Sequence, residues 1–126
     1  GMVPGSHGST YGNNPLGMAV GAATLEVMLA DGFFDYVKQV GSLLKAGLAR
    51  LVKDFPEQIE EARGTGLMLG LKTRVSAPEL MEKLRAKQLL TAAAGEDVLR
   101  LLPPLIIEEA HVEEAVTVLR DTLQAG

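Results

Sequence analysis

This sequence has no cysteine and no tryptophan, and its 126 residues include only two histidines, two tyrosines and three phenylalanines. The absence of cysteine excludes disulfide frameworks, cysteine-ligated zinc sites, redox CxxC pairs and thiol nucleophiles. It also fits a reducing compartment, so we expect a cytoplasmic protein. Because His7 and His111 are the only imidazoles, we expect no metal site.

Long runs of one charge or of apolar residues are also missing. The 12 Lys and Arg residues against 16 Asp and Glu residues give a net charge of -4, and no basic run suits a phosphate backbone, so we expect no nucleic-acid partner. The longest apolar stretch, 16–30, contains Glu26 and is shorter than the roughly 20 residues that span a bilayer. Residues 1–14 lack the basic and apolar regions of a signal peptide. We therefore expect neither a membrane partner nor secretion.

The pattern of apolar residues and helix breakers predicts one ordinary α+β domain with a small antiparallel or mixed sheet of about four strands, covered by helices. Asn14 and Pro15 mark the start of a helix that is apolar on nearly all sides and is therefore expected to be buried. Ser76 and Glu79 predict a capping box. The expected order is a loop over 1–14, helices over 15–30 and 33–55, strands over 59–63 and 67–72, a helix over 77–87, strands over 89–94 and 98–102, and a helix over 109–124.

Two motifs resemble functional sites but have simpler explanations. Gly64–Gly70 resembles a dinucleotide-binding fingerprint, yet a strand rather than a helix is expected after it, so a turn between strands is the better interpretation. Glu108 and His111 have the spacing of helix-borne metal ligands. A single copy without facing carboxylates is more typical of a solvated first helical turn.

The glycine-rich segment Gly8–Gly12 suits anion binding, because it offers backbone N–H groups, the hydroxyls of Ser9 and Thr10, and a helix N-terminus at Asn14. A nucleophilic role for Ser9 is disfavoured, since no strand precedes it and His7 cannot be assigned as its base. A flexible linker explains the same composition about equally well.

Arg100 is the only charged residue in the apolar run 98–107. If this strand is covered, the guanidinium needs an anion, and arginine is the side chain that binds a carboxylate through two parallel hydrogen bonds. An arginine on an open sheet face, or paired with an internal glutamate, fits the pattern equally well.

Taken together, these motifs resemble the C-terminal third of class III pyridoxal-phosphate (PLP) aminotransferases, most closely the acetylornithine-type members. The resemblance covers essentially the whole chain. Relatives commonly carry a second glycine where this chain has Asn13. The motifs are the segment His7–Leu16, the buried helix, the long helix, the Arg63–Gly70 strand entry, and the Arg100-x-x-Pro103-Pro104 strand exit.

The resemblance implies the C-terminal small domain of a fold type I enzyme, comprising residues 15–126, with residues 1–14 forming a loop at the dimer and cofactor interface. It implies a homodimer that transfers an amino group from N-acetylornithine, or a similar ω-amino donor, to 2-oxoglutarate through PLP in arginine biosynthesis. Thr10 would bind the cofactor phosphate across the dimer interface, Ser9 would lie near the substrate, and Arg100 would hold the substrate α-carboxylate.

The same resemblance places the Schiff-base lysine and the aspartate that pairs with the pyridine nitrogen in an N-terminal large domain. No lysine of this chain has the matching context, so we expect no catalytic residue here and no activity from this chain alone. Two other hypotheses stay open: a stand-alone α+β module that binds a carboxylate or phosphate through Arg100 and the Ser9–Thr10 loop, and a purely structural interaction domain.

Overall fold

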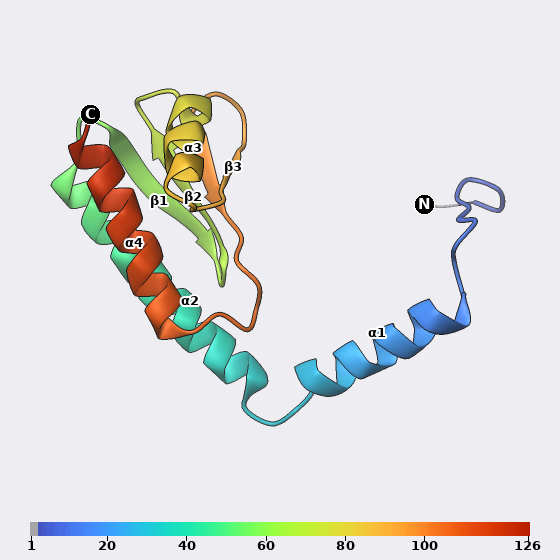
Figure 1. The fold of residues 1–126 in the computed structure, drawn as a ribbon. Helices are drawn as coiled ribbons and strands as arrows, with labels where there is room; N and C mark the ends of the chain where they lie inside the picture. The colour runs from blue at the N-terminus through green and yellow to red at the C-terminus, as the bar shows by residue number, and fades with distance from the viewer. Residues whose placement is uncertain (1–2) are drawn as a thin grey trace. The chain divides into compact units, whose positions relative to one another are not determined.

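The computed structural model describes residues 3–126, which form two compact units divided between Phe34 and Asp35 (Figure 1). Gly1 and Met2, which begin the loop expected over 1–14, lie outside the described residues. The first unit contains that loop and helix α1 (Pro15–Met28). No single helix of residues 3–126 is long and apolar enough to cross a membrane, and only α1 and α2 (Phe33–Asp54) taken together reach that length and composition.

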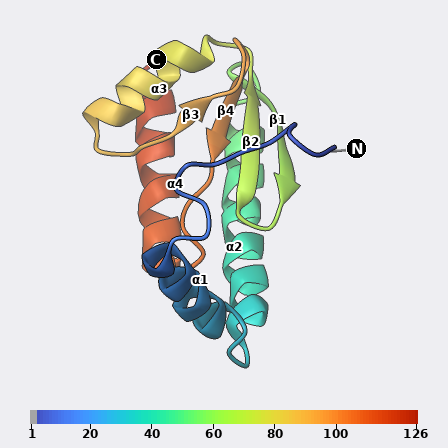
Figure 2. The same ribbon diagram turned by 90° about the vertical axis from the view of Figure 1, so that its right-hand side faces the viewer.

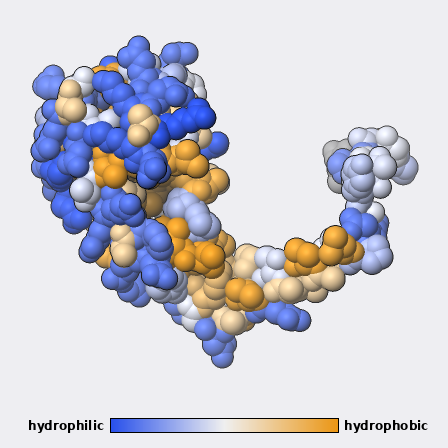
Figure 3. All heavy atoms as spheres, viewed as in Figure 1, coloured by the Kyte–Doolittle hydropathy of each residue, from blue (hydrophilic) through white to orange (hydrophobic). Residues whose placement is uncertain are grey.

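Helix α1 begins as its sequence predicts. Asn14 is the N-cap, its side-chain oxygen accepts a hydrogen bond from the Gly17 amide at 2.7 Å, and Pro15 occupies the first helical position. The expectation that this helix is buried is wrong for the chain by itself, because none of its residues is buried. Figure 3 shows apolar side chains along its length. Apolar composition indicates that a helix needs a covering surface, but it does not say which chain provides that surface.

The second unit confirms the expected α+β class and the order of its elements (Figure 1). Four strands form one sheet in the order β1-β2-β4-β3, and every neighbouring pair is antiparallel. The elements that follow α2 are β1 (Ile59–Thr65), β2 (Met68–Thr73), α3 (Ala77–Ala86), β3 (Ala92–Ala93), β4 (Val98–Leu101) and α4 (Glu109–Gln124).

The hydrophobic core lies on one face of this sheet. Figures 1 and 2 show α2 and α4 side by side against it, and α3 contacts α4, β3 and β4. The two long helices approach closely at Gly47, where an added Cβ would lie 2.6 Å from Val116 Cγ2. Alternate residues of β2 and β4 are buried in this core, as are one stripe of α2 and one of α4: Leu69, Leu71, Leu99, Leu101, Val40, Leu44, Leu48, Leu51, Val112, Leu119 and Leu123. The opposite sheet face, which we call the open face, is covered by no helix of Asp35–Gly126.

The Gly64–Gly70 segment is a hairpin turn, as the sequence predicts. Gly66 and Leu67 link β1 to β2, and Gly66 has a φ of 57°. A positive φ at the first of two loop residues is what a type II′ hairpin turn requires. Gly64 has a φ of 126°, and an added Cβ would lie 2.2 Å from the Met68 carbonyl oxygen. These glycines are therefore explained by the turn, without a nucleotide.

Strand β3 is much shorter than the expected 89–94. The preceding residues complete the end of α3 in a Schellman motif, in which the Leu89 amide donates to the Leu84 carbonyl and the Gln88 amide donates to the Arg85 carbonyl, both at 3.0 Å. The Leu89 amide is thus part of the helix cap and not of a strand. Gln88 takes a left-handed φ of 66°, a position where glycine is usual.

We expect Gln88→Gly to raise the free energy of unfolding by about 0.5–1 kcal/mol, because glycine adopts this φ without the steric cost that a Cβ imposes. Urea unfolding measures the effect. Lys87→Gly is the matched control: the neighbouring residue has a φ of -96°, so glycine there should lower stability. A Gln88→Gly variant that is no more stable than the parent chain would contradict the prediction.

Candidate functional site

The segment Gly8–Gly12 forms an exposed turn in the first unit, closed by a hydrogen bond from the Gly12 amide to the Ser9 carbonyl at 3.3 Å. Ser9 and Thr10 are exposed neighbours, and neither hydroxyl hydrogen-bonds to another described residue. Residues 3–14 carry no acidic side chain. The turn therefore presents free hydroxyl and amide donors without a competing carboxylate, which is chemistry that suits a phosphate.

Asn13 shapes the turn before α1. Its φ is 57°, in the left-handed region that glycine adopts freely and that asparagine tolerates better than most residues. Asn14 then caps α1 and also donates a side-chain hydrogen bond to the Tyr11 carbonyl at 2.6 Å. The two asparagines thus join the turn to the helix N-terminus.

Arg100 lies on β4 in the second unit, and its side chain is exposed on the open face. Its neighbours Leu99 and Leu101 are 0% and 5% exposed and point into the core, so strand alternation directs Arg100 to the opposite side. Arg100 forms no ion pair with a described residue. Of the alternatives left by the sequence, the open sheet face is the one observed, and the internal glutamate is not.

The sheet register places two small residues beside Arg100. Arg100 is paired with Gly70 on β2 and with Ala92 on β3. Its partner on each neighbouring strand therefore has little or no side chain. An added Cβ at Gly70 would lie 3.2 Å from Val98 Cγ1. Sequence reasoning missed this contribution of Gly70 and Ala92, because the register that brings them beside Arg100 cannot be read from either strand alone.

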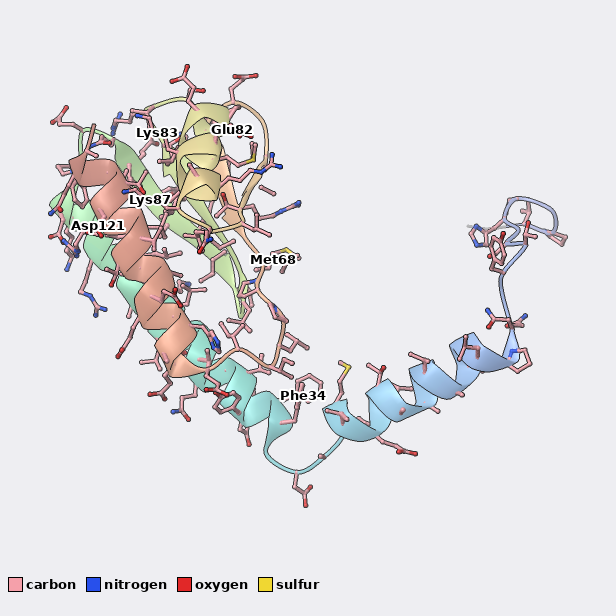
Figure 4. The ribbon with its side chains drawn as sticks, viewed as in Figure 1. Phe34, Met68, Glu82, Lys83, Lys87 and Asp121 are labelled. Atoms are coloured by element: carbon pink, nitrogen blue, oxygen red, sulfur yellow. The ribbon has the colours of Figure 1, made fainter. Side chains whose placement is uncertain are left out.

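Two other cations on this side of the sheet have carboxylate partners. Lys72 donates to Glu60 at 2.8 Å, and this hydrogen bond lowers the pKa of Glu60 and raises the pKa of Lys72. Arg63 contacts Glu61 at 3.2 Å. The exposed Met68 side chain extends away from α2 and α4 (Figure 4). Arg100 is therefore the open-face cation most available to an external anion.

Other candidate chemistry does not form a site. The backbone amide of Glu108 donates to His111 Nδ1 at 3.0 Å, so the Glu-x-x-His spacing belongs to the start of α4. Residues 3–126 contain no group of three or more His, Asp or Glu residues arranged to hold a metal ion. Lys83 and Lys87 are exposed at α3 (Figure 4).

The three residues predicted from the sequence thus lie at two places. Ser9 and Thr10 are neighbours on the turn before α1, and Arg100 is on β4 beside Gly70 and Ala92. Each place has donors for an anionic group. No Ser or Thr hydroxyl of residues 3–126 hydrogen-bonds to a His, Asp or Glu side chain, so these two places offer hydrogen-bond donors to an anion and no nucleophile paired with a base.

Comparison with known proteins gives the family. The family model for class III aminotransferases matches residues 1–123. Acetylornithine aminotransferase from Agrobacterium fabrum is 50% identical over 116 residues, which cover 92% of this chain and 29% of that protein. The mitochondrial acetylornithine aminotransferase of Candida glabrata is 40% identical, covering 90% of this chain and 27% of that protein. The chain therefore spans less than a third of the length of these relatives.

Solved structures agree with the sequence relatives. The acetylornithine aminotransferase from Elizabethkingia anophelis superposes with a TM-score of 0.85 at 28% identity, covering 99% of this chain and 32% of that one. The lysine aminotransferase from M. tuberculosis gives a TM-score of 0.86 at 32% identity, covering 98% and 29%. The matching motifs, fold and relatives lead to one conclusion: this chain belongs to the class III aminotransferase family.

Proposed function

We propose that this chain is the C-terminal part of a PLP-dependent enzyme that transfers an amino group from N-acetylornithine, or a similar ω-amino donor, to 2-oxoglutarate in arginine biosynthesis. The observation that carries the substrate assignment is the 48–50% identity to several proteins named acetylornithine aminotransferase, over at least 92% of this chain. The alignments cover about 30% of those proteins, so the proposal includes a longer chain, located in the cytoplasm.

The exposed turn before α1 fits the phosphate of PLP. The Thr10 hydroxyl and the free backbone amides of Gly8–Tyr11 are hydrogen-bond donors, and no acidic side chain of residues 3–14 opposes an anion. We assign Thr10 to the cofactor phosphate across the dimer interface and Ser9 to the adjacent substrate. PLP, when bound, supplies the electron sink that stabilises negative charge on the substrate carbon.

Arg100 suits the α-carboxylate of the substrate. Its guanidinium can donate two parallel hydrogen bonds to one carboxylate, and its neighbours Gly70 and Ala92 leave room for that approach. Binding there fixes the orientation of the substrate but moves no proton. Arg100 is thus a positioning group, and its contribution is to hold the reacting amine or carbonyl in place.

The proposal also includes a large domain and a second copy of the complete enzyme. No residue of α1 is buried in this chain, and five of its large apolar side chains are more than half exposed: Leu16, Met18, Val20, Leu25 and Val27. Extensive apolar surface of this kind marks an interface in soluble proteins. We assign residues 1–14 to the dimer and cofactor interface, residues 15–126 to the small domain, and the Schiff-base lysine to the large domain.

The proposal is tested by comparing the complete protein with the 126-residue chain in a glutamate-forming assay with N-acetylornithine, 2-oxoglutarate and PLP. The complete protein should be active, and the chain alone should show no turnover above background. Ornithine, succinylornithine and 4-aminobutyrate, offered as alternative donors, identify the substrate.

The DNA sequence upstream of Gly1 provides an independent check. An open reading frame that continues upstream with a lysine in a cofactor-binding context is expected. A translation start at Met2, or transamination by the purified 126-residue chain, would contradict the proposal. The first of these results would favour the stand-alone carboxylate- or phosphate-binding module.

A further inference from the structure

A small hollow in the second unit lies between α2 and the β1–β2 turn. It has a volume of about 240 Å³. Two lysines, two hydroxyl residues and three glycines line it: Lys38, Lys45, Ser42, Thr65, Gly41, Gly64 and Gly66. None of these lining residues is acidic.

The two walls of this hollow are held together by glycines. An added Cβ at Gly41 would lie 2.9 Å from both the carbonyl carbon and the carbonyl oxygen of Gly66, so α2 meets the turn through backbone contact. Gly41 is itself buried. Lys38 lies three residues before Gly41 and Lys45 lies four residues after it, which places both lysines on the helix face that meets the turn.

The Ser42 hydroxyl donates to the Lys38 carbonyl at 2.8 Å, but other hydrogen-bond donors in this hollow are free or only weakly used. Lys45 Nζ lies 3.4 Å from the Gly64 carbonyl oxygen, which leaves at least two of its three ammonium protons for another acceptor. The Thr65 hydroxyl makes no hydrogen bond to another described residue. Apart from the ladder bonds between strands, the Gly66 amide donates no hydrogen bond to a described backbone carbonyl. The ion pair between Lys38 and Asp35, at 3.0 Å, has both side chains more than three-quarters exposed. Such a pair contributes little and exchanges readily for a stronger anion.

We propose that this hollow is an anion-binding site for the phosphoryl or diphosphate group of a small molecule. Lysine ammonium groups act as point charges that suit phosphate, and the turn adds hydroxyl and amide donors. Its volume is below the roughly 300–1,000 Å³ of ordinary ligand pockets, so it has room for the charged group and not for a whole nucleotide. This inference goes beyond the proposed aminotransferase function, because neither PLP nor an amino-group substrate takes part in it.

The test is an NMR titration of the isotope-labelled 126-residue chain with sodium pyrophosphate, and separately with orthophosphate, at constant ionic strength in a phosphate-free buffer. Saturable shifts of the amides at Gly41 and Gly64–Gly66 are expected. Lys45→Gln should raise the dissociation constant about tenfold, and Lys38→Gln should raise it less because Lys38 is shared with Asp35. Lys53→Gln, on the same helix and outside the hollow, is the matched control.

Tighter binding of pyrophosphate than orthophosphate would support a diphosphate ligand, and equal binding would support a single phosphoryl group. Shifts that chloride reproduces at the same ionic strength would overturn the proposal, as would the absence of saturable shifts. Equal affinities of Lys45→Gln and Lys53→Gln would also overturn it. None of these results depends on transaminase activity, so failure of this site and failure of the proposed function are distinguishable.

Discussion

Replacement of Arg100 by alanine in the complete enzyme is expected to lower kcat/KM about 10²–10³-fold for the substrate whose α-carboxylate it holds. The reason is the loss of two charge-assisted hydrogen bonds to that α-carboxylate. Steady-state kinetics with each substrate varied in turn measures the effect. Because Arg100 is exposed and has no ion-pair partner among the described residues, the variant should unfold at the same urea concentration as the parent enzyme.

Arg100→Lys separates charge from geometry. Lysine keeps the positive charge but cannot form the paired, planar contact, so activity should lie between those of Arg100→Ala and the parent enzyme. Arg85→Ala is the control, because it removes an exposed arginine of α3 whose distance to Glu82 is 3.9 Å. If Arg100→Ala and Arg85→Ala had the same kinetics, Arg100 would not bind the substrate. PLP content should be unchanged in all three variants.

The placement of Arg100 shows what strand patterning can and cannot predict. The sequence left open whether Arg100 lies on a covered or an open face, and the structure shows it opposite Leu99 and Leu101, which are buried in the core. An apolar run alone does not say whether that second face is covered. The pairing of Arg100 with Gly70 and Ala92 depends on strand register, which is set by the packing of three strands and not by any one of them.

Rules that depend on a few neighbouring residues gave the most accurate predictions. Asn14 and Ser76 are N-caps where expected, since a side-chain oxygen facing free helix amides is a local interaction. Of the capping box expected at Ser76, the bond from the Glu79 amide to the Ser76 hydroxyl is present, at 3.4 Å, and the return bond from the Glu79 side chain is not. The limits of β3 and the exposure of α1 could not be predicted in this way. The first depends on Gln88 continuing the end of α3 in a left-handed conformation, and the second depends on surface that this chain does not supply.

The second large effect is expected at the β1–β2 turn. Gly64→Ala should lower the free energy of unfolding by about 3 kcal/mol, because its φ of 126° is strained for any residue with a Cβ and that Cβ would lie 2.2 Å from the Met68 carbonyl oxygen. The strands must move apart to relieve this contact, since the obstacle is backbone and not a flexible side chain. Urea unfolding of the 126-residue chain measures the loss.

Gly66→Ala is the matched control in the same turn. Gly66 also has a positive φ, but no atom lies within 4 Å of its added Cβ, so only the conformational cost of about 1 kcal/mol should remain. Equal losses at the two positions would contradict the role given to the Met68 contact. The difference matters beyond stability, because Gly64 is paired with Leu69, the residue before the Gly70 that lies beside Arg100. In the complete enzyme, Gly64→Ala should therefore also lower kcat/KM, whereas Gly66→Ala should leave it near that of the parent.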